Sequence, residues 1–482
     1  MKKKKNIKSY ILIVLSALII IFTLYINKRI YNASFEQYIY TLLKSSGTSS
    51  TSFVYGSIYI TIGVLLLVPL LLLPTFNYKK EIKIKNKRIL PIKNIKRYSR
   101  VLIVIAIIYL AYGVGLFGFI KNKLVETDLF KEYYVEADKV EIKFPENKKN
   151  LIYIYLESME STNFSIENGG IYKESIIPNL EKLAQGNINF SNTDLLGGAQ
   201  ESYGTGWTVA AMIAQTAGVP LKMKLNDYEE SSTEFNNIKT LGDILHNNGY
   251  NNYLLLGSNS VFGGRRAYFE KHKYIISDYQ TAIETGKIEE DYFEWWGYED
   301  SKLFEYAKEK LTEISKSEDP FNLTMLTADT HFTDGYIDKS CKVDVFEDKY
   351  ANSFYCSDSM IKSFIDWIKE QDFYDNTVII LVGDHLTMQE NFYDIDDYTR
   401  TIYNAFINVN INDINNKNRV FTTMDMYPTT LGALGVQIEG NRLGLGTNLF
   451  SNKKSIPEEI GLDKFNEELK KNSNYYYDYI RG

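Results

Sequence analysis

Three long apolar segments stand near the start of the chain, before any alternating pattern begins. Residues 10–26, 53–76 and 101–120 contain no charged side chain. A helix needs roughly 20 such residues to cross the hydrocarbon layer of a bilayer. The alternative is a cleaved signal peptide followed by buried core helices, but "TLYINKRIYN" offers no small-residue cleavage site and two further apolar segments follow. The pattern therefore predicts three transmembrane helices, at about residues 9–27, 53–76 and 101–120.

The pattern changes at residue 150, where short apolar segments begin to alternate with helical ones. This alternation is typical of an α/β domain with a central, mostly parallel sheet. The expected strands are residues 150–156, 252–257, 321–327, 376–382 and 404–411, and the clearest helices are residues 238–250 and 356–374. We therefore divide the chain into a membrane domain (1–120), a linker or stalk (121–149), an α/β domain (150–455) and a C-terminal tail (456–482).

Charge is distributed unevenly along the chain. Residues 1–100 carry 18 basic and 2 acidic side chains, whereas the remaining residues carry 36 basic and 58 acidic ones. Most of these basic residues lie before the first apolar segment and between the second and third, which is the bias of cytoplasmic loops. With three spans, this bias predicts a cytoplasmic N-terminus and an α/β domain on the outer side of the cell membrane. The acidic balance of that domain argues against nucleic acid as a partner.

Polar side chains follow four of the predicted strands, at the point where each strand ends. Glu157 follows the first strand and Arg265 lies in the loop after the second. His331 follows the third strand, and Asp384 and His385 follow the fourth. Because ligands of open α/β sheets bind at the carboxyl ends of the strands, we expect these side chains to share one site.

Part of this set has the chemistry of a metal site. Glu157, Asp384 and His385, with the Thr205 hydroxyl as a fourth ligand, would supply three oxygens and one nitrogen. Such a set suits a hard or borderline divalent ion, Mn²⁺ or Mg²⁺. A metal-bound alcohol loses its proton readily, so Thr205 would become a nucleophile, and the helix that follows it would favour an anion. Both features point to phosphorus chemistry.

The only two cysteines, Cys341 and Cys356, lie in the α/β domain. Two unrelated free thiols are one interpretation, and a local disulfide is the other. An oxidising exterior favours the disulfide, and the spacing matches no metal-ligand pattern.

Several motifs resemble the alkaline phosphatase/sulfatase superfamily, in its membrane phosphoglycerol transferase branch. The most specific are "YLES", "GTGWTVAAMIAQTAGVPL", "TADTHFTDGY", "VIILVGDHLTM" and "MDMYPTTLGALG". The resemblance covers roughly residues 150–450 and the arrangement of membrane helices before an exterior domain. It is closer to transferases that decorate periplasmic glucans than to lipoteichoic acid synthases.

The resemblance implies roles for single residues. It gives Thr205 as the nucleophile, His331 as a contact of the transferred phosphate and Arg265 as a second phosphate contact, and it favours Mn²⁺. Thr208 is the rival nucleophile within "GTGWT". We choose Thr205 because it lies between two glycines at the turn, whereas Thr208 is expected inside the helix. The family's metal ligands fall on Glu157, Thr205, Asp384 and His385.

The function that the resemblance implies is transfer of glycerol phosphate from phosphatidylglycerol to a hydroxyl of a cell-envelope glycan, through a phospho-threonine intermediate and with release of diacylglycerol. One alternative is a phosphoethanolamine transferase acting on lipid A or a glycan. A second is a membrane-anchored, inactive sulfatase-like envelope protein. The sulfatase Cys/Ser-x-Pro-x-Arg signature is absent from the sequence, so hydrolysis of sulfate esters is not expected.

Overall fold

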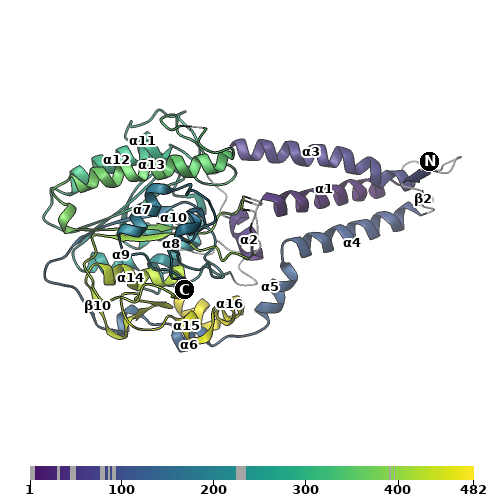
Figure 1. Ribbon diagram of the computed structural model, residues 1–482. Helices are drawn as coiled ribbons and strands as arrows, with labels where there is room; N and C mark the ends of the chain where they lie inside the picture. The colour runs from purple at the N-terminus through teal and green to yellow at the C-terminus, as the bar shows by residue number, and fades with distance from the viewer. Residues whose placement is uncertain are drawn as a thin grey trace. The chain divides into compact units, whose positions relative to one another are not determined.

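A computed structural model gives the fold of the chain (Figure 1). It describes residues 6–29, 33–43, 50–75, 82–84, 87–89, 94–223, 235–342, 344–389, 392–393, 395 and 397–482. The chain forms two compact units. The first comprises Met1–Tyr38 and Ser49–Lys121, and the second comprises Ile39–Thr48 and Asn122–Gly482.

The first unit is built mainly of apolar helices. Two of them are long and apolar enough to cross a membrane, over Ile7–Lys28 and Ser57–Thr75. The third predicted span is not one straight helix, because it bends by 63° between α4 (Ile95–Gly113) and α5 (Leu116–Lys123), where Gly115 adopts a φ of 72°. Two or three spans are therefore compatible with the helices. The elements between Ile7 and Lys123, some of which cross the boundary between the units, are α1 (Ile7–Arg29), α2 (Phe35–Leu43), α3 (Ser50–Leu72), β1 (Ile82–Ile84), β2 (Lys87–Ile89), α4 (Ile95–Gly113) and α5 (Leu116–Lys123).

The second unit contains a six-stranded sheet in the order β6-β5-β7-β4-β8-β9. Its strands are β4 (Asn150–Leu156), β5 (Asn251–Leu256), β6 (Tyr274–Ser277), β7 (Phe321–Leu326), β8 (Thr377–Gly383) and β9 (Asn404–Ile407). All neighbours pair in parallel except β8 and β9. The prediction of a mostly parallel α/β sheet is confirmed. The short edge strand β6 is absent from the sequence-based prediction, and the last strand ends at Ile407, earlier than predicted.

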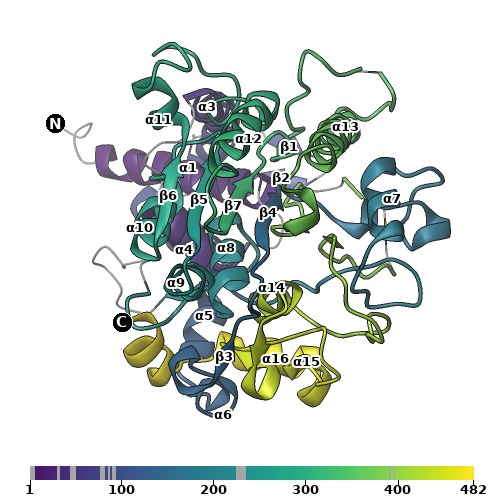
Figure 2. The same ribbon diagram turned by 90° about the vertical axis from the view of Figure 1, so that its left-hand side faces the viewer.

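Helices cover both faces of this sheet, so alternate residues of β4 pack into different layers (Figure 2). Leu151, Tyr153 and Tyr155 pack among residues of one layer, and Ile152 and Ile154 pack among those of the other. Burial on both faces explains why the central strands are continuous apolar segments rather than alternating ones. The first layer holds α8 (Thr208–Ala217), α9 (Leu241–Asn247), α10 (Arg265–Lys271) and α14 (Met426–Ala433), and the second holds α7 (Pro178–Gly186), α12 (Asp300–Ile314) and α13 (Lys349–Lys369).

The segments on either side of the predicted α/β domain belong to the same compact unit as the sheet. The ring of Phe130 lies 5.0 Å from that of Tyr476 in the C-terminal segment, and both side chains are fully buried. The expected linker and tail are therefore packed parts of the second unit. They contain α6 (Leu129–Tyr133), β3 (Ile142–Lys143), which pairs with β10 (Gln437–Ile438), α15 (Ile456–Ile460) and α16 (Leu462–Lys470).

Cys341 and Cys356 form a disulfide, as the sequence favoured. Cys356 lies within α13, which begins at Lys349 and so starts earlier than the predicted helix 356–374. The bond ties the loop after β7 to this helix.

Candidate active site

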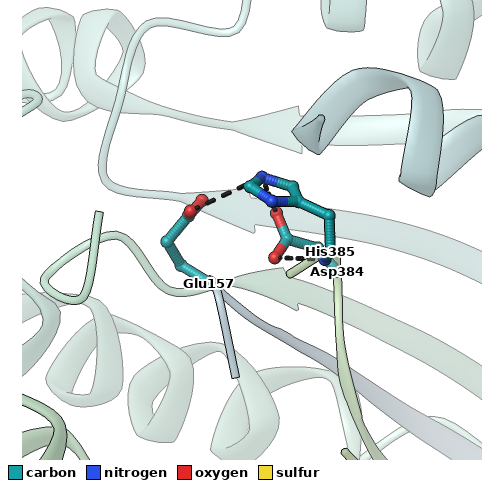
Figure 3. Close-up of side chains that lie close together, drawn as sticks. All are labelled: Glu157, Asp384 and His385. Carbon is teal, nitrogen blue, oxygen red and sulfur yellow. Dashed lines mark hydrogen bonds and ion pairs between the residues drawn. The ribbon is translucent and has the colours of Figure 1, made fainter. Parts of the chain in front are cut away.

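Three buried side chains meet at the carboxyl ends of β4 and β8. Glu157 follows β4, and Asp384 and His385 follow β8, the strand beside it in the sheet (Figure 3). One ligand atom from each lies within 4.8 Å of the others. The structure therefore brings together three of the four residues that the sequence predicted as protein ligands of a metal.

Main-chain groups and one hydroxyl fix the orientation of these side chains. Oδ1 of Asp384 accepts hydrogen bonds from the N–H groups of Ser158 and His385, both at 2.8 Å. Oε1 of Glu157 accepts one from the Ser158 hydroxyl at 2.8 Å. Nδ1 of His385 lies 2.8 Å from the carbonyl oxygen of Leu386. Since a carbonyl only accepts, Nδ1 carries a proton, and Nε2 is the ring nitrogen that faces the two carboxylates.

The remaining donor atoms fit a cation. Oδ2 of Asp384 is buried and has no hydrogen-bond partner among the described residues. It lies 3.3 Å from Nε2 of His385, which is also 3.6 Å from Oε1 of Glu157. A buried oxygen of this kind is costly unless a ligand satisfies it. The cluster thus leaves one oxygen and one nitrogen directed at the same point.

The charges of the cluster also favour a bound cation. Burial and the negative charge of Glu157 raise the pKa of Asp384 to about 7. Burial lowers the pKa of His385, but the charges of Asp384 and Glu157 outweigh this effect and raise it to about 9. Two buried carboxylates therefore compete for positive charge, which a divalent ion would supply.

The threonine hydroxyl that lies beside the cluster is that of Thr208, not that of Thr205 as the sequence predicted. Oγ1 of Thr208 lies 3.4 Å from Oε2 of Glu157 and 3.4 Å from Nε2 of His385. Oγ1 of Thr205 instead donates to the carbonyl oxygen of Ser202 at 2.8 Å, within its own turn. Thr205 therefore stabilises the turn before the helix, and Thr208 is the threonine that contacts the cluster.

Thr208 is the first residue of α8. The residue before it, Trp207, makes no side-chain capping hydrogen bond to the helix. The first N–H groups of a helix have no partner within it and carry its positive dipole end. The Thr208 hydroxyl is thus positioned where these groups favour an anion such as a phosphate.

His331 lies in the loop after β7. Its Nδ1 is 2.6 Å from the carbonyl oxygen of Phe332, so Nδ1 carries the proton and Nε2 is the acceptor. Burial lowers the pKa of His331 to about 4, and the positive charge of nearby His385 adds to this effect. His331 is therefore neutral at physiological pH, and its Nε2 has no hydrogen-bond partner among the residues that the structure describes.

The loop that carries His331 is held from two sides. The carboxylate of Asp300 accepts hydrogen bonds from the N–H groups of Ala328 at 2.8 Å and Asp329 at 3.0 Å. The Thr330 hydroxyl donates to the carbonyl oxygen of Glu157 at 2.5 Å. The second bond joins the His331 loop to the loop that carries Glu157. Asp300 lies in a different segment of the chain, and its role could not be anticipated from the sequence around His331.

Arg265 is a buried cation at the start of α10, only 4% exposed. Its Nε donates to the carbonyl oxygen of Phe262 at 3.0 Å, and Nη2 donates to that of Asn259 at 2.8 Å. Burial lowers its pKa to about 10, an effect that the charge of Glu157 opposes. Arg265 is therefore charged at neutral pH, and no described carboxylate forms an ion pair with it.

Comparison with known proteins agrees with this geometry. The sequence model of the Sulfatase family matches residues 149–436, more than half of the chain. The chain belongs to the sulfatase family. The resemblance predicted from its motifs is confirmed at this level.

Among curated proteins, the chain is similar to phosphoglycerol transferase I from Shigella flexneri and from Escherichia coli strain 55989, with 32% identity over 366 residues in each case. Each match covers 71% of this chain and 46% of the relative, so the chain spans about half the length of these relatives. Among solved structures, it is similar in fold to the integral membrane protein lipooligosaccharide phosphoethanolamine transferase A from Neisseria meningitidis. That match has a TM-score of 0.53 and 15% identity, and it covers 89% of this chain and 84% of that one.

Proposed function

We propose that this sulfatase-family protein transfers glycerol phosphate from phosphatidylglycerol to a hydroxyl of a cell-envelope glycan, through a phosphodiester on Thr208. The similarity to phosphoglycerol transferase I supports the transferred group. The observation that carries the proposal is the position of the Thr208 hydroxyl, 3.4 Å from both Glu157 and His385 at the start of a helix. Thr208 takes the role that the sequence gave to Thr205.

Glu157, Asp384 and His385 would hold one divalent ion, with Thr208 as the fourth ligand. When bound, such an ion lowers the pKa of a coordinated alcohol and offsets charge on phosphoryl oxygens. The oxygen-rich ligand set and the family resemblance favour Mn²⁺, with Mg²⁺ as the alternative.

In the first step, Oγ1 of Thr208 attacks the phosphorus of the lipid. A bond forms between Oγ1 and phosphorus, and the bond from phosphorus to the diacylglycerol oxygen breaks. The proton of the threonine hydroxyl ends on the leaving diacylglycerol. Arg265 and the N–H groups at the start of α8 stabilise the charge on the non-bridging oxygens.

In the second step, an acceptor hydroxyl attacks the same phosphorus. Its oxygen forms the new bond, the bond to Oγ1 breaks, and the threonine regains a proton. His331 suits the role of general base, because Nδ1 carries the proton and Nε2 is the acceptor nitrogen. A direct hydrogen bond from Nε2 to the phosphate would require the other protonation state.

A membrane anchor suits this donor, because the phosphate of a phospholipid stays at the membrane surface. We propose that α1, α3 and the bent pair α4–α5 form three spans, with the N-terminus in the cytoplasm and the second unit outside. This orientation rests on the basic loop between the second and third apolar segments, and that loop lies largely outside the described residues.

The direct test supplies purified full-length protein with phosphatidylglycerol or phosphatidylethanolamine, each labelled in its headgroup, together with Mn²⁺ and envelope glycan. We expect label from phosphatidylglycerol in the glycan and an equal amount of diacylglycerol. Transfer of the ethanolamine label alone would move the assignment to a phosphoethanolamine transferase. Absence of both products would indicate an inactive envelope protein.

A further inference from the structure

An aromatic cluster adjoins His331 and is not used by the mechanism above. The ring of Trp296 lies 4.6 Å from that of His331 and 5.7 Å from that of Phe262. The ring of Phe332 stacks on that of His331 at 4.8 Å. All three aromatic side chains are partly exposed. The proposed general base therefore contacts aromatic rings that solvent reaches.

The loop that carries Trp296 is fixed at both of its flanks. On one side, the indole N–H of Trp295 donates to the carbonyl oxygen of Ala328 at 3.1 Å, at the end of β7. On the other, the N–H of Tyr298 donates to the carbonyl oxygen of Gly257 at 2.9 Å, at the end of β5. A Cβ on Gly297 would come within 2.0 Å of that same oxygen, so only glycine permits this approach. Trp296 is thus held at the site before any ligand arrives.

We propose that Trp296 is the platform on which a sugar ring of a neutral glycan acceptor stacks, so that one of its hydroxyls reaches Nε2 of His331. This inference rests on the proposed transfer reaction and specifies its acceptor. The C–H-rich face of a pyranose matches the face of an indole ring, while the sugar hydroxyls remain free to form hydrogen bonds. The platform lies next to the base that the acceptor hydroxyl must approach.

The charge around the platform favours a neutral glycan. Residues 289–300, which contain Trp296, hold six acidic and no basic side chains. Glu289, Glu290 and Asp291 are exposed. Like charges repel, so the exposed end of this loop disfavours an anionic polymer. The rival occupant is an acyl chain of the donor, for which the exposed side chains of Val261 (47%) and Phe293 (45%) would provide an apolar path.

The test compares wild type with Trp296→Ala, Trp296→Phe and Phe293→Ala in the full-length protein. Phe293 belongs to the same loop and packs on Tyr279 rather than on His331, which makes it a matched control. Two rates are measured: diacylglycerol release in a single turnover, and transfer to a linear neutral glucose oligosaccharide. A second acceptor of the same length carries glucuronate units.

We expect Trp296→Ala to raise the KM for the neutral oligosaccharide roughly tenfold. The single-turnover release of diacylglycerol should change by less than about twofold. Trp296→Phe should restore most of the affinity, Phe293→Ala should transfer as wild type does, and wild type should prefer the neutral acceptor. Restoration by phenylalanine also separates loss of the platform from loss of folding.

Three results would overturn the inference. These are a wild-type KM in Trp296→Ala, an equal loss of diacylglycerol release and transfer in that variant, or a preference for the glucuronate acceptor. The second result would assign Trp296 to the lipid donor. If the proposed function itself were wrong, the wild-type protein would release no diacylglycerol, and this result distinguishes that failure from failure of the inference about Trp296.

Discussion

The hydroxyl oxygen of Thr208 lies 3.4 Å from Nε2 of His385, although the two residues are far apart in the sequence. The sheet creates this proximity. Strand β8 ends just before His385, and α8 begins with Thr208 on the layer that covers this part of the sheet. The relationship joins the proposed nucleophile to the proposed metal site and motivates the predictions that follow.

The cluster should bind one divalent ion through Asp384. Replacing Asp384 by Asn removes charge from the ligand whose Oδ2 has no described partner, so Mn²⁺ affinity should fall by at least about 10-fold. Isothermal titration with Mn²⁺ measures this independently of activity. Asp358→Asn is a matched control, because Asp358 is also buried but accepts hydrogen bonds from Asn179 and Leu180. Equal Mn²⁺ affinity in wild type and Asp384→Asn would contradict the assignment.

Arg265 should act on the lipid donor. Removing one preorganised charge donor typically costs about 100-fold or more in rate, so Arg265→Ala should lower kcat/KM for phosphatidylglycerol by about that factor. Arg265→Lys should recover part of it, since lysine keeps the charge without the fork of donors. The neighbouring Arg266 pairs with Glu270 and Asp278, and Arg266→Lys should remain close to wild type. Similar losses in both lysine variants would argue for a structural role of the loop.

His331 should give an unusual pH dependence. Burial lowers its pKa from 6.5 to about 4, so the neutral base persists well below pH 6.5. At saturating metal, the rate of transfer should hold as the pH falls from about 7 to about 5.5. An ordinary histidine base would lose about tenfold over that interval. A roughly tenfold loss of rate in wild type that is absent from His331→Gln would contradict this prediction, because it would show that His331 titrates with an ordinary pKa.

The same shift affects stability, with a defined sign. Between about pH 4 and pH 6.5 the unfolded chain binds a proton at His331 that the folded chain does not bind. Stability from this residue is therefore present above pH 6.5 and is lost as the pH falls toward 4. Thermal unfolding of wild type and His331→Gln across this interval should diverge, with wild type losing more.

The disulfide should stabilise the second unit. Cys341 and Cys356 are 15 residues apart, and closing a loop of this size contributes about 3 kcal/mol to the free energy of unfolding. Reduction should therefore lower the midpoint of thermal unfolding of the wild type. The Cys341→Ser, Cys356→Ser double variant should show the low midpoint with or without reductant. A reductant effect that survives in the double variant would have another origin.

Much of the fold could be predicted from the sequence, because the apolar segments that form the central strands are local patterns. Strand β4 matches its prediction residue for residue, since a central strand buried on both faces appears as one uninterrupted apolar segment. Strand β6 is a four-residue edge strand with mixed burial, and such a pattern gives no comparable signal. The packing of Phe130 on Tyr476 joins segments from both ends of the second unit, so no local pattern reveals it.

The residues of the site that directly follow strands could be predicted from the sequence, because the strand ends determine their positions. Glu157, Asp384 and His385 follow parallel neighbours, and the register of β4 on β8 brings them together. The choice between Thr205 and Thr208 depends instead on which hydroxyl the first helical turn directs at the cluster. That direction follows from the turn at Ser202, where Thr205 is bonded, and composition alone does not encode it.

The most direct measurement is the position of the covalent intermediate. Full-length protein with Mn²⁺ and phosphatidylglycerol, quenched in acid before acceptor is added, would be digested and mapped by mass spectrometry. We predict glycerol phosphate on Thr208, its loss in Thr208→Ala together with about 1000-fold or more of the turnover, and its persistence in Thr205→Ala. Glycerol phosphate on Thr205, or full turnover by Thr208→Ala, would contradict it.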